Sequence, residues 1–299
     1  DYSPAGNAWE YFGHDQAHLR AYRWNEDGLA GICDEQQRLC FALALWNGHD
    51  PILKERAFGL TGKQGNHGED VKEYYFYLDN TPTHSYMKYL YKYPQREFPY
   101  QQLVEQNQAR AGEGPEYELL DTGVFDDDRY FDVEVEYAKA SPSDICIHIK
   151  AYNRGADTAP LHIIPQLCYR NTWSWSDHRG PEPSIRVDPG KAQVSGESDH
   201  ISLLADSSAI DPLKGLLSPY VLGNYYLHAR GCCKPLFTNN ETNMPAVFGP
   251  GATSHSPFVK DAFHHYIINK EASINPELAG TKSCLHYQFS IPAGEYVEI

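Results

Sequence analysis

The sequence predicts an all-β fold, a large antiparallel β super-sandwich with a few short surface helices. Three observations predict this fold. Apolar and polar residues alternate with a period of two over several segments, turns rich in Gly, Pro and Asn separate these segments, and only one segment has a helical pattern. The length of 299 residues fits one large all-β domain or two ordinary ones. Because no internal repeat or clear linker divides the chain, we expect a single sandwich domain over residues 1–299.

The first predicted strands carry many aromatic residues. They cover Val71–Leu78 and Tyr86–Tyr93, and bulky side chains occupy both faces of each. We therefore expect both strands to lie centrally in a sheet, covered on two sides. A helix follows from Pro99 to about Gly112, and its thin apolar stripe, which includes Leu103 and Val104, predicts a place on the surface.

Clear alternation continues along the rest of the chain. It predicts strands at Phe131–Tyr137, Ile145–Ile149, Leu161–Leu167 and Leu285–Ile291, and a final partial strand after a turn at Pro292–Gly294. The Pro- and Gly-rich stretch Gly180–Gly196 reads as a long excursion between strands. Strands at this spacing with short turns are typical of an antiparallel sandwich.

The charge balance narrows the possible ligands. The chain has 40 Asp and Glu against 25 Lys and Arg, which gives a formal net charge of −15. A nucleic-acid backbone or an anionic membrane would repel such a chain, so we expect neither as a partner. No stretch approaches the roughly 18–20 continuous apolar residues that a membrane span needs. The 22 Tyr, 12 Phe and 5 Trp suit strands, interfaces and sugar rings.

The cysteines indicate the compartment. Seven are present, none in a CxxC pair, and several occupy strand patterns where a free thiol packs as a small hydrophobe. This favours reduced cysteines and a cytoplasmic location. Secretion stays open as an alternative because Asn240-Glu241-Thr242 matches the short N-glycosylation pattern.

Two short motifs invite metal chemistry. His14 and His18 would share one face of a helix, as zinc ligands do, and Asp126–Asp128 offers oxygens for Ca²⁺. Neither has the rest of its motif, because the zinc pattern lacks its Glu and the acidic run lacks the spacing of an EF-hand. A polar packed loop and a solvated turn explain them better, and we expect no metal and no cofactor.

Candidate sugar-contacting residues gather in two places. A Gly-rich loop places His67, Glu69 and Asp70 just before the aromatic strand that holds Tyr74. Adjacent carboxylates point to opposite faces of a strand and cannot easily flank one glycosidic bond, so the loop predicts hydrogen-bonding anchors or sugar contacts rather than a catalytic pair.

The second place follows a strand end. Trp173 and Trp175 alternate there with polar residues. We expect one of them in the core and the other as a stacking platform or an interdomain anchor.

Several longer runs resemble one family of enzymes. They include Trp9–Phe12, Ala44–Gly48 with Asp50–Arg56, Gly65–Asp79 (GNHGEDVKEYYFYLD), Asn171–Trp175 and Val259–His264. Together they are similar to the N-terminal region of proteins of glycoside hydrolase family 63, the group of mannosylglycerate hydrolases and processing glucosidases. The similarity covers nearly the whole chain.

The resemblance implies that the catalytic residues lie in a different domain from this chain. In that family a β super-sandwich precedes an (α/α)₆ barrel, which carries the acid and base carboxylates of an inverting α-glycosidase. The sequence stops where the sandwich would end, so we expect no catalytic residue in this chain. Its expected partners are its own C-terminal catalytic barrel and a neutral oligosaccharide. The residues expected near the substrate or the domain interface are Trp9, His67, Glu69, Asp70, Tyr74, Trp173 and Trp175.

Two other functions fit a sandwich fold. One is a free-standing carbohydrate-binding module that stacks exposed aromatic rings on sugars. The other is a structural or interaction module without a sugar role, since a fold alone fixes no function.

Overall fold

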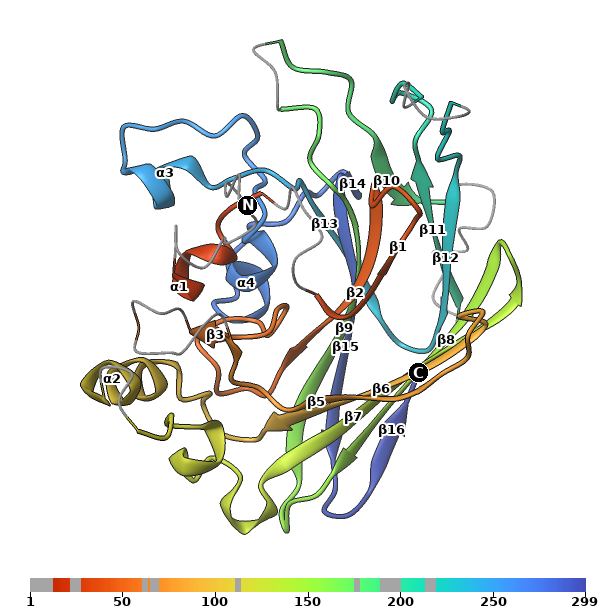
Figure 1. Ribbon diagram of the computed structural model, residues 1–299. Helices are drawn as coiled ribbons and strands as arrows, with labels where there is room; N and C mark the ends of the chain where they lie inside the picture. Colours follow the sequence, from red (N-terminus) through yellow and green to blue (C-terminus); the bar gives the residue numbers. More distant parts are fainter. Residues whose placement is uncertain are drawn as a thin grey trace. The chain divides into compact units, whose positions relative to one another are not determined.

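The computed structural model describes residues 13–21, 28–60, 64, 70–110, 114–174, 178–188, 200–212 and 219–299. Within these residues the protein is the predicted all-β antiparallel sandwich with a few short helices (Figure 1). By its internal contacts the chain divides into two compact units. The first unit comprises Asp15–Ala44 and Ile164–Tyr287, and the second comprises Leu45–Ile163 and Gln288–Ile299 with the segment that ends at His14.

One sheet of five strands belongs to the second unit. Its strand order is β16-β8-β7-β6-β5, and all its neighbours are antiparallel. The strands are β5 (Tyr75–Asn80), β6 (Tyr86–Pro94), β7 (Tyr130–Ser141), β8 (Asp144–Asn153) and β16 (Tyr296–Glu298). The strands predicted from alternation at Phe131–Tyr137 and Ile145–Ile149 are therefore confirmed as β7 and β8, and the expected last strand is β16.

The alternation along β7 is visible in its burial. Val133, Val135 and Tyr137 are buried, whereas Glu134 and Glu136 are partly exposed. Asp132 breaks the pattern, because it is buried and accepts hydrogen bonds from Lys92 and Arg154.

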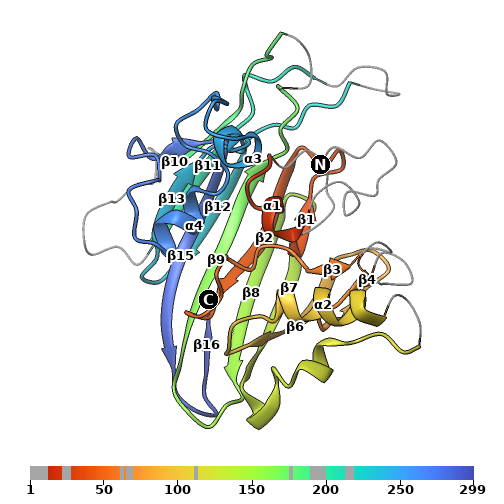
Figure 2. The ribbon, with the colours of Figure 1, turned by 90° about the vertical axis from the view of Figure 1, so that its left-hand side faces the viewer.

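The predicted surface helix packs on a small core of its own. Helix α2 (Tyr100–Arg110) buries Leu103 in a cluster with Phe58, Leu60 and Phe98. Figure 2 shows α2 beside the short strands β3 (Gly59–Leu60) and β4 (Asp70–Val71). The 3₁₀ turns η3 (Leu119–Thr122) and η4 (Asp126–Asp128) follow, and η4 is the turn expected before β7.

A sheet of four strands belongs to the first unit. It has the order β12-β11-β10-β14 and consists of β10 (Ser184–Val187), β11 (His200–Asp206), β12 (Tyr225–Arg230) and β14 (Ala279–Gly280). The short helices are α1 (His14–Ala17), α3 (Met244–Phe248) and α4 (Ala262–Ile267).

The remaining large sheet has the order β1-β2-β9-β15-β13. Its strands are β1 (Leu29–Cys33), β2 (Leu39–Trp46), β9 (Ala159–Tyr169), β15 (Lys282–Ile291) and β13 (Lys234–Thr238). The predicted strands at Leu161–Leu167 and Leu285–Ile291 are thus confirmed. Three of these strands, β2, β9 and β15, contribute residues to both units.

Two sequence predictions about strands are wrong. The aromatic run Val71–Leu78 is not one central strand, since β4 ends at Val71 and β5 starts at Tyr75. Between them Lys72 and Glu73 bury their charged side chains in ion pairs, and β5 pairs only with β6 among the described residues. β5 is an edge strand with five of its six residues exposed, while β6 is central as expected.

The second error concerns the excursion Gly180–Gly196. It contains β10, which pairs with β11 on one side and β14 on the other and buries Ile185 completely. Residues 189–199 lie outside the described part of the chain.

All seven cysteines are free thiols, as expected. Among the helices that the structure describes, none has both the length and the apolar character that a membrane crossing demands.

Candidate functional site

The sequence-predicted site residues divide into those the structure describes and those it does not. Tyr74 and Trp173 are described, and they belong to different units. For Asp70 only the backbone, in β4, is described. The residues outside the described part are Trp9, His67, Glu69 and Trp175.

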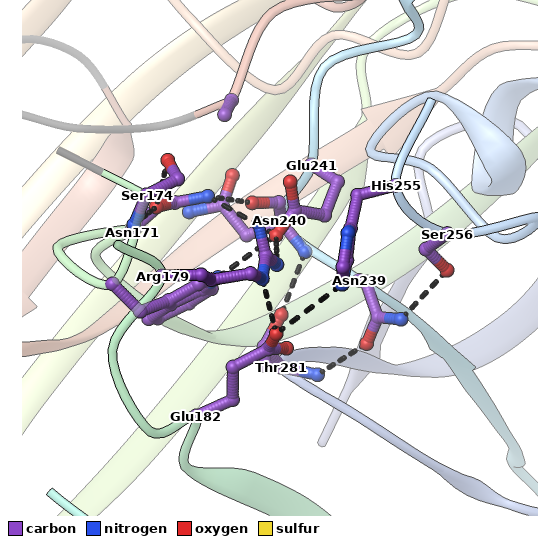
Figure 3. A network of polar contacts seen from close by, with 12 residues as sticks. Asn171, Ser174, Arg179, Glu182, Asn239, Asn240, Glu241, His255, Ser256 and Thr281 are labelled. Carbon is purple, nitrogen blue, oxygen red and sulfur yellow. Dashed lines mark hydrogen bonds and ion pairs between the residues drawn. The ribbon is translucent and has the colours of Figure 1, made fainter. Parts of the chain in front are cut away.

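Trp173 lies in a polar cluster of the first unit, which we call the Glu241 cluster (Figure 3). Figure 3 labels Asn171, Ser174, Arg179, Glu182, Asn239, Asn240, Glu241, His255, Ser256 and Thr281 of this cluster, and Trp173 belongs to it through its hydrogen bond to Glu241. Trp173 is 4% exposed and donates its indole N–H to Oε1 of Glu241 at 2.8 Å. Trp173 is therefore the tryptophan that we expected in the core.

Two buried asparagines fix the backbone around this cluster. Nδ2 of Asn171 donates to the Asn240 carbonyl at 2.8 Å, and Oδ1 of Asn171 accepts from the Ser174 hydroxyl at 2.7 Å. Asn240 in turn donates to the Tyr169 carbonyl at the end of β9. The loops that follow β9 and β13 are thus tied together by amide side chains, which offer both donors and acceptors.

Asn240 is also the acceptor residue of the glycosylation pattern. Its side chain is fully buried, and its backbone N–H donates to Oγ1 of Thr281. A glycan has no access to this side chain in the folded protein, so the pattern belongs to the packing of the cluster.

Arg179 joins two carboxylates. Its Nε donates to Oε1 of Glu182 at 2.7 Å, and its Nη2 donates to Oε1 of Glu241. Burial disfavours the charged guanidinium, but the two carboxylates outweigh this and raise the pKa of Arg179 above its ordinary value. At the rim, His255 is largely exposed, with Nε2 at 3.9 Å from Glu182.

The arrangement suits binding better than acid catalysis. Glycoside hydrolysis uses two carboxyl groups that flank the bond to be cleaved, whereas Glu182 and Glu241 both pair with the guanidinium of Arg179. The exposed rim, with His255 and part of Glu182, offers a donor or acceptor and an anionic acceptor. Such groups can hold the hydroxyls of a neutral ligand.

A second buried polar centre lies behind the aromatic strands of the second unit. We call it the Lys54 centre, and it comprises Asp50, Lys54, Phe58, Glu73, Tyr91, Tyr93, Phe98 and Tyr100. The side chains of Lys54 and Glu73 are both fully buried, with Nζ 3.1 Å from Oε1. Nζ also lies 3.9 Å from the centre of the Phe98 ring and 4.6 Å from that of Tyr100. The ammonium is thus held by one carboxylate and two aromatic faces.

The carboxylates of Glu73 and Asp50 each accept two hydrogen bonds in this centre. Glu73 accepts from the Phe58 backbone N–H and the Tyr91 hydroxyl. Asp50 accepts from the Tyr93 hydroxyl at 2.6 Å and from the Phe98 N–H at 2.7 Å. Burial nevertheless raises the pKa of Asp50, against the opposing effect of the Lys54 charge.

Tyr74 sits beside this centre in the chain but packs in the apolar cluster of α2. Its ring lies 6.0 Å from that of Phe125, and burial raises the pKa of its hydroxyl. The backbone N–H of Lys92 donates to the Tyr74 carbonyl at 2.9 Å. Its ring therefore contributes to the packing of this apolar cluster.

The metal motifs of the sequence have other contacts. His14 stacks on Tyr100 and meets Phe58 edge to face, whereas the ring of His18 lies 4.7 Å from that of His264. Within the described residues no group of three or more His, Cys, Asp and Glu side chains is placed to hold a metal ion.

Sequence reasoning missed the residues at the middle of both centres. Glu241 stands inside the glycosylation pattern, Lys54 inside the run Asp50–Arg56 and Glu73 inside the run Gly65–Asp79. An available signal was the pairing of charged with aromatic letters in Lys72-Glu73-Tyr74-Tyr75, since a charge within an aromatic run needs a buried partner.

Fold and site define an acidic antiparallel β-sandwich with two buried polar centres. Over 313 aligned positions the chain is 42% identical to "Uncharacterized protein YMR196W" of Saccharomyces cerevisiae. The alignment covers all of this chain but 29% of the yeast protein, so the chain spans less than a third of that relative's length. No family model matches the chain. No solved structure matches it either.

Proposed function

We propose that this chain is the non-catalytic N-terminal β-sandwich of a glycoside hydrolase of the family 63 type. The enzyme would act on neutral α-glucosyl-type saccharides. The sandwich supports a helical catalytic barrel and lends loops to one wall of the sugar site. This proposal rests on the resemblance of the long sequence runs, together with the following observations.

The strongest structural support for the proposal is the exposed edge strand β5. Phe76, Tyr77 and Leu78 are consecutive and are 43%, 81% and 48% exposed. An unpaired edge with three large apolar residues promotes association, and soluble proteins usually cover or charge such edges. The strand belongs to the run GNHGEDVKEYYFYLD, so the resemblance and the exposed edge coincide. We infer that a catalytic barrel covers β5.

Two further facts agree with this role. The yeast relative is more than three times as long as the stretch that aligns with this chain, which leaves ample length for a catalytic domain. The Glu241 cluster presents hydroxyl-binding groups at its rim, and the charge of −15 favours a neutral ligand over an anionic one.

The test is a hydrolysis assay with stereochemistry. The full-length protein that carries this chain should hydrolyse α-glucosyl saccharides with inversion at the anomeric carbon, followed by proton NMR, and the isolated chain should not. In the full-length protein His67→Ala and Glu69→Gln should lower kcat/KM. Hydrolysis by the isolated chain, or a full-length protein inactive on every α-glycoside tried, contradicts the proposal. Unchanged kcat/KM in both variants refutes the assignment of the loop alone.

One observation favours a carbohydrate-binding module as a second candidate. On the edge strand β12 the exposed rings of Tyr226 and His228 lie parallel with centres 6.0 Å apart, and His200 continues the row at 5.9 Å. Exposed flat rings in a row can stack on successive sugars.

Calorimetry separates the two candidates. Titration of gluco-oligosaccharides into the isolated chain should give no binding heat if the chain is a supporting sandwich. Saturable heat that is lost in Tyr226→Ala favours the binding module. If neither this titration nor the hydrolysis assay gives a signal, the chain is a structural module without a sugar role.

A further inference from the structure

Two cysteines face each other across the hairpin of β1 and β2. The register of the two strands pairs the Cα atoms of Cys33 and Cys40. Each of these residues stands next to the loop that joins the strands, Cys33 as the last residue of β1 and Cys40 as the second of β2. Both lie on the same face of the hairpin, because directly opposed residues point the same way.

The hydrogen bonds identify the kind of pair. The backbone N–H of Asp34 donates to the carbonyl of Leu39 at 3.2 Å, so these two residues occupy a hydrogen-bonded position. Hydrogen-bonded and non-hydrogen-bonded pairs alternate along an antiparallel ladder. Cys33 and Cys40 therefore occupy a non-hydrogen-bonded position, where Cα atoms lie about 4.5 Å apart. Disulfides bridge Cα separations of about 4.4–6.8 Å, so this position accepts one without backbone movement.

The loop between the two cysteines is held rigidly. The carboxylate of Asp34 accepts hydrogen bonds from the backbone N–H groups of Gln36, Arg38 and Leu39. The same carboxylate also accepts a hydrogen bond from the Tyr220 hydroxyl, which donates to Oδ2 at 2.7 Å. A loop fixed in this way keeps the two thiols opposite each other.

The two thiols have different surroundings. Cys33 is exposed, whereas Cys40 is buried, with 8% of its surface accessible. The Cys40 thiol donates a weak hydrogen bond to the Gln37 carbonyl at 3.9 Å. Its interaction with the Cys33 sulfur lowers the pKa of Cys33 to about 7, although burial and the nearby Asp34 oppose this. An exposed, readily ionised thiol next to a second cysteine is the usual arrangement of an attacking and a resolving cysteine.

We propose that Cys33 and Cys40 form a redox-active dithiol that exchanges with small-molecule disulfides and closes into an intramolecular disulfide. This inference is independent of the proposed function, because it uses only the hairpin of β1 and β2.

The exchange runs in two steps. The Cys33 thiolate attacks one sulfur of a disulfide RSSR, forms a mixed disulfide Cys33–S–SR and releases RS⁻. The Cys40 thiol loses its proton to solvent, attacks the sulfur of Cys33 and displaces the second RS⁻. The two cysteines are oxidised by two electrons, RSSR is reduced to two thiols, and the two protons of the cysteines end on these thiols.

The disulfide between Cys33 and Cys40 would attach the edge strand β1 covalently to β2. Among the strands that the structure describes, β1 is the outer strand of its sheet and pairs only with β2. Its register with β2 shifts between Leu29 and Ile32, where Ala30 has a positive φ. A covalent link at the loop end would secure the strand whose ladder is interrupted at its other end.

The test uses the whole chain and oxidised glutathione. The protein is equilibrated in glutathione buffers of increasing oxidised fraction, remaining thiols are blocked with N-ethylmaleimide, and intact mass and peptide maps are recorded. We expect two of the seven thiols to disappear together and a peptide containing the Cys33–Cys40 bond to accumulate. In Cys40→Ser the mixed disulfide should instead remain on Cys33, which adds one glutathione to the mass.

A matched control is Cys146→Ser. Cys146 is exposed on β8 and its register partner is Ala138, so its loss should leave the bridge unchanged. The proposal is overturned if buffers that glutathionylate Cys146 leave Cys33 and Cys40 unbridged. It is also overturned if the bond maps to another pair.

Discussion

The buried charge of Lys54 makes the stability of the fold sensitive to a change at this single residue. Its ammonium is fully buried, and among the described side chains the carboxylate of Glu73 is the one within ion-pair distance. Taking both charges out of water is costly, and the pair is maintained because the Tyr91 hydroxyl and the Phe58 N–H also bind Glu73. Removing one charge leaves the other buried without compensation.

We therefore predict that Lys54→Met lowers the free energy of unfolding by about 3–5 kcal/mol. The double variant Lys54→Met/Glu73→Gln should recover a large part, because the Glu73 carboxylate no longer stays buried without its cation. Arg96→Ala is the control, since its pair with Asp127 is exposed and should change stability by less than about 0.5 kcal/mol. Urea unfolding followed by circular dichroism measures all three. Equal losses in Lys54→Met and in the double variant contradict the account.

His286 gives the protein a dependence on pH. Burial, with the nearby cations Lys270 and Lys234, lowers the pKa of this histidine to about 4. The unfolded chain binds the proton near pH 6.5, so between pH 6.5 and 4 the unfolded state holds more protons than the folded one. Stability contributed by the neutral ring is therefore complete above pH 6.5 and is lost progressively as pH falls to about 4.

The variant His286→Gln should remove this part of the pH dependence. We expect the wild type to lose about 2–3 kcal/mol more than the variant between pH 7 and pH 4. Parallel pH profiles for wild type and His286→Gln would show that the ring is not held neutral.

At the residue scale, the sequence predicted a core position for one of the two tryptophans but not the partner of Trp173. The prediction that one of the two tryptophans belongs to the core is confirmed, but its partner Glu241 lies 68 positions away. The ion pair of Lys54 and Glu73 was not predicted for a similar reason, because its two residues are also distant in the sequence. Which distant strands and loops meet depends on topology, and a single sequence does not display it.

At the scale of elements, periodicity predicted the regular strands and the helix. The alternation covers seven residues in each of β7, β9 and β15 and five in β8, and these strands have one or two well-packed faces, so their patterns are clear. β10 has only four residues, and β5 lies in a continuous aromatic run without alternation. Neither sequence pattern indicates where the strand lies in its sheet. The difference between a central and an edge strand arises from pairing, and composition does not encode it.

β14 provides a prediction about an element. A Cβ atom on Gly280 would overlap the carbonyl oxygen of Thr238, at the end of β13. Gly280→Ala should therefore displace β14 from β13 and lower the free energy of unfolding by about 3 kcal/mol or more.

Gly251→Ala is the matched control. A Cβ atom there has nothing within 4 Å, so stability should stay within about 0.5 kcal/mol of the wild type. Thermal unfolding by calorimetry compares the two variants. A wild-type melting temperature for Gly280→Ala would mean that the backbones of β13 and β14 are not in close contact.

At the scale of the whole molecule, the aromatic excess divides into two roles. Tyr89, Tyr91 and Tyr93 of β6 are at most 7% exposed and fill the core, while Phe76 and Tyr77 of the neighbouring β5 face outward. The excess therefore cannot be assigned as a whole to an interface. The part on β5 remains available for a partner, and it is the part on which the proposed function depends.

The measurement that tests this most directly is hydrogen exchange along β5. It compares the full-length yeast relative with its isolated segment that aligns with this chain. If a catalytic domain covers the edge, amides of the segment equivalent to Tyr75–Asn80 should exchange at least about tenfold more slowly in the full-length protein. Amides at the centre of β7 should be equally protected in both. Identical exchange of the β5 segment in the two proteins would contradict the proposal that the rest of the longer chain packs on this sandwich.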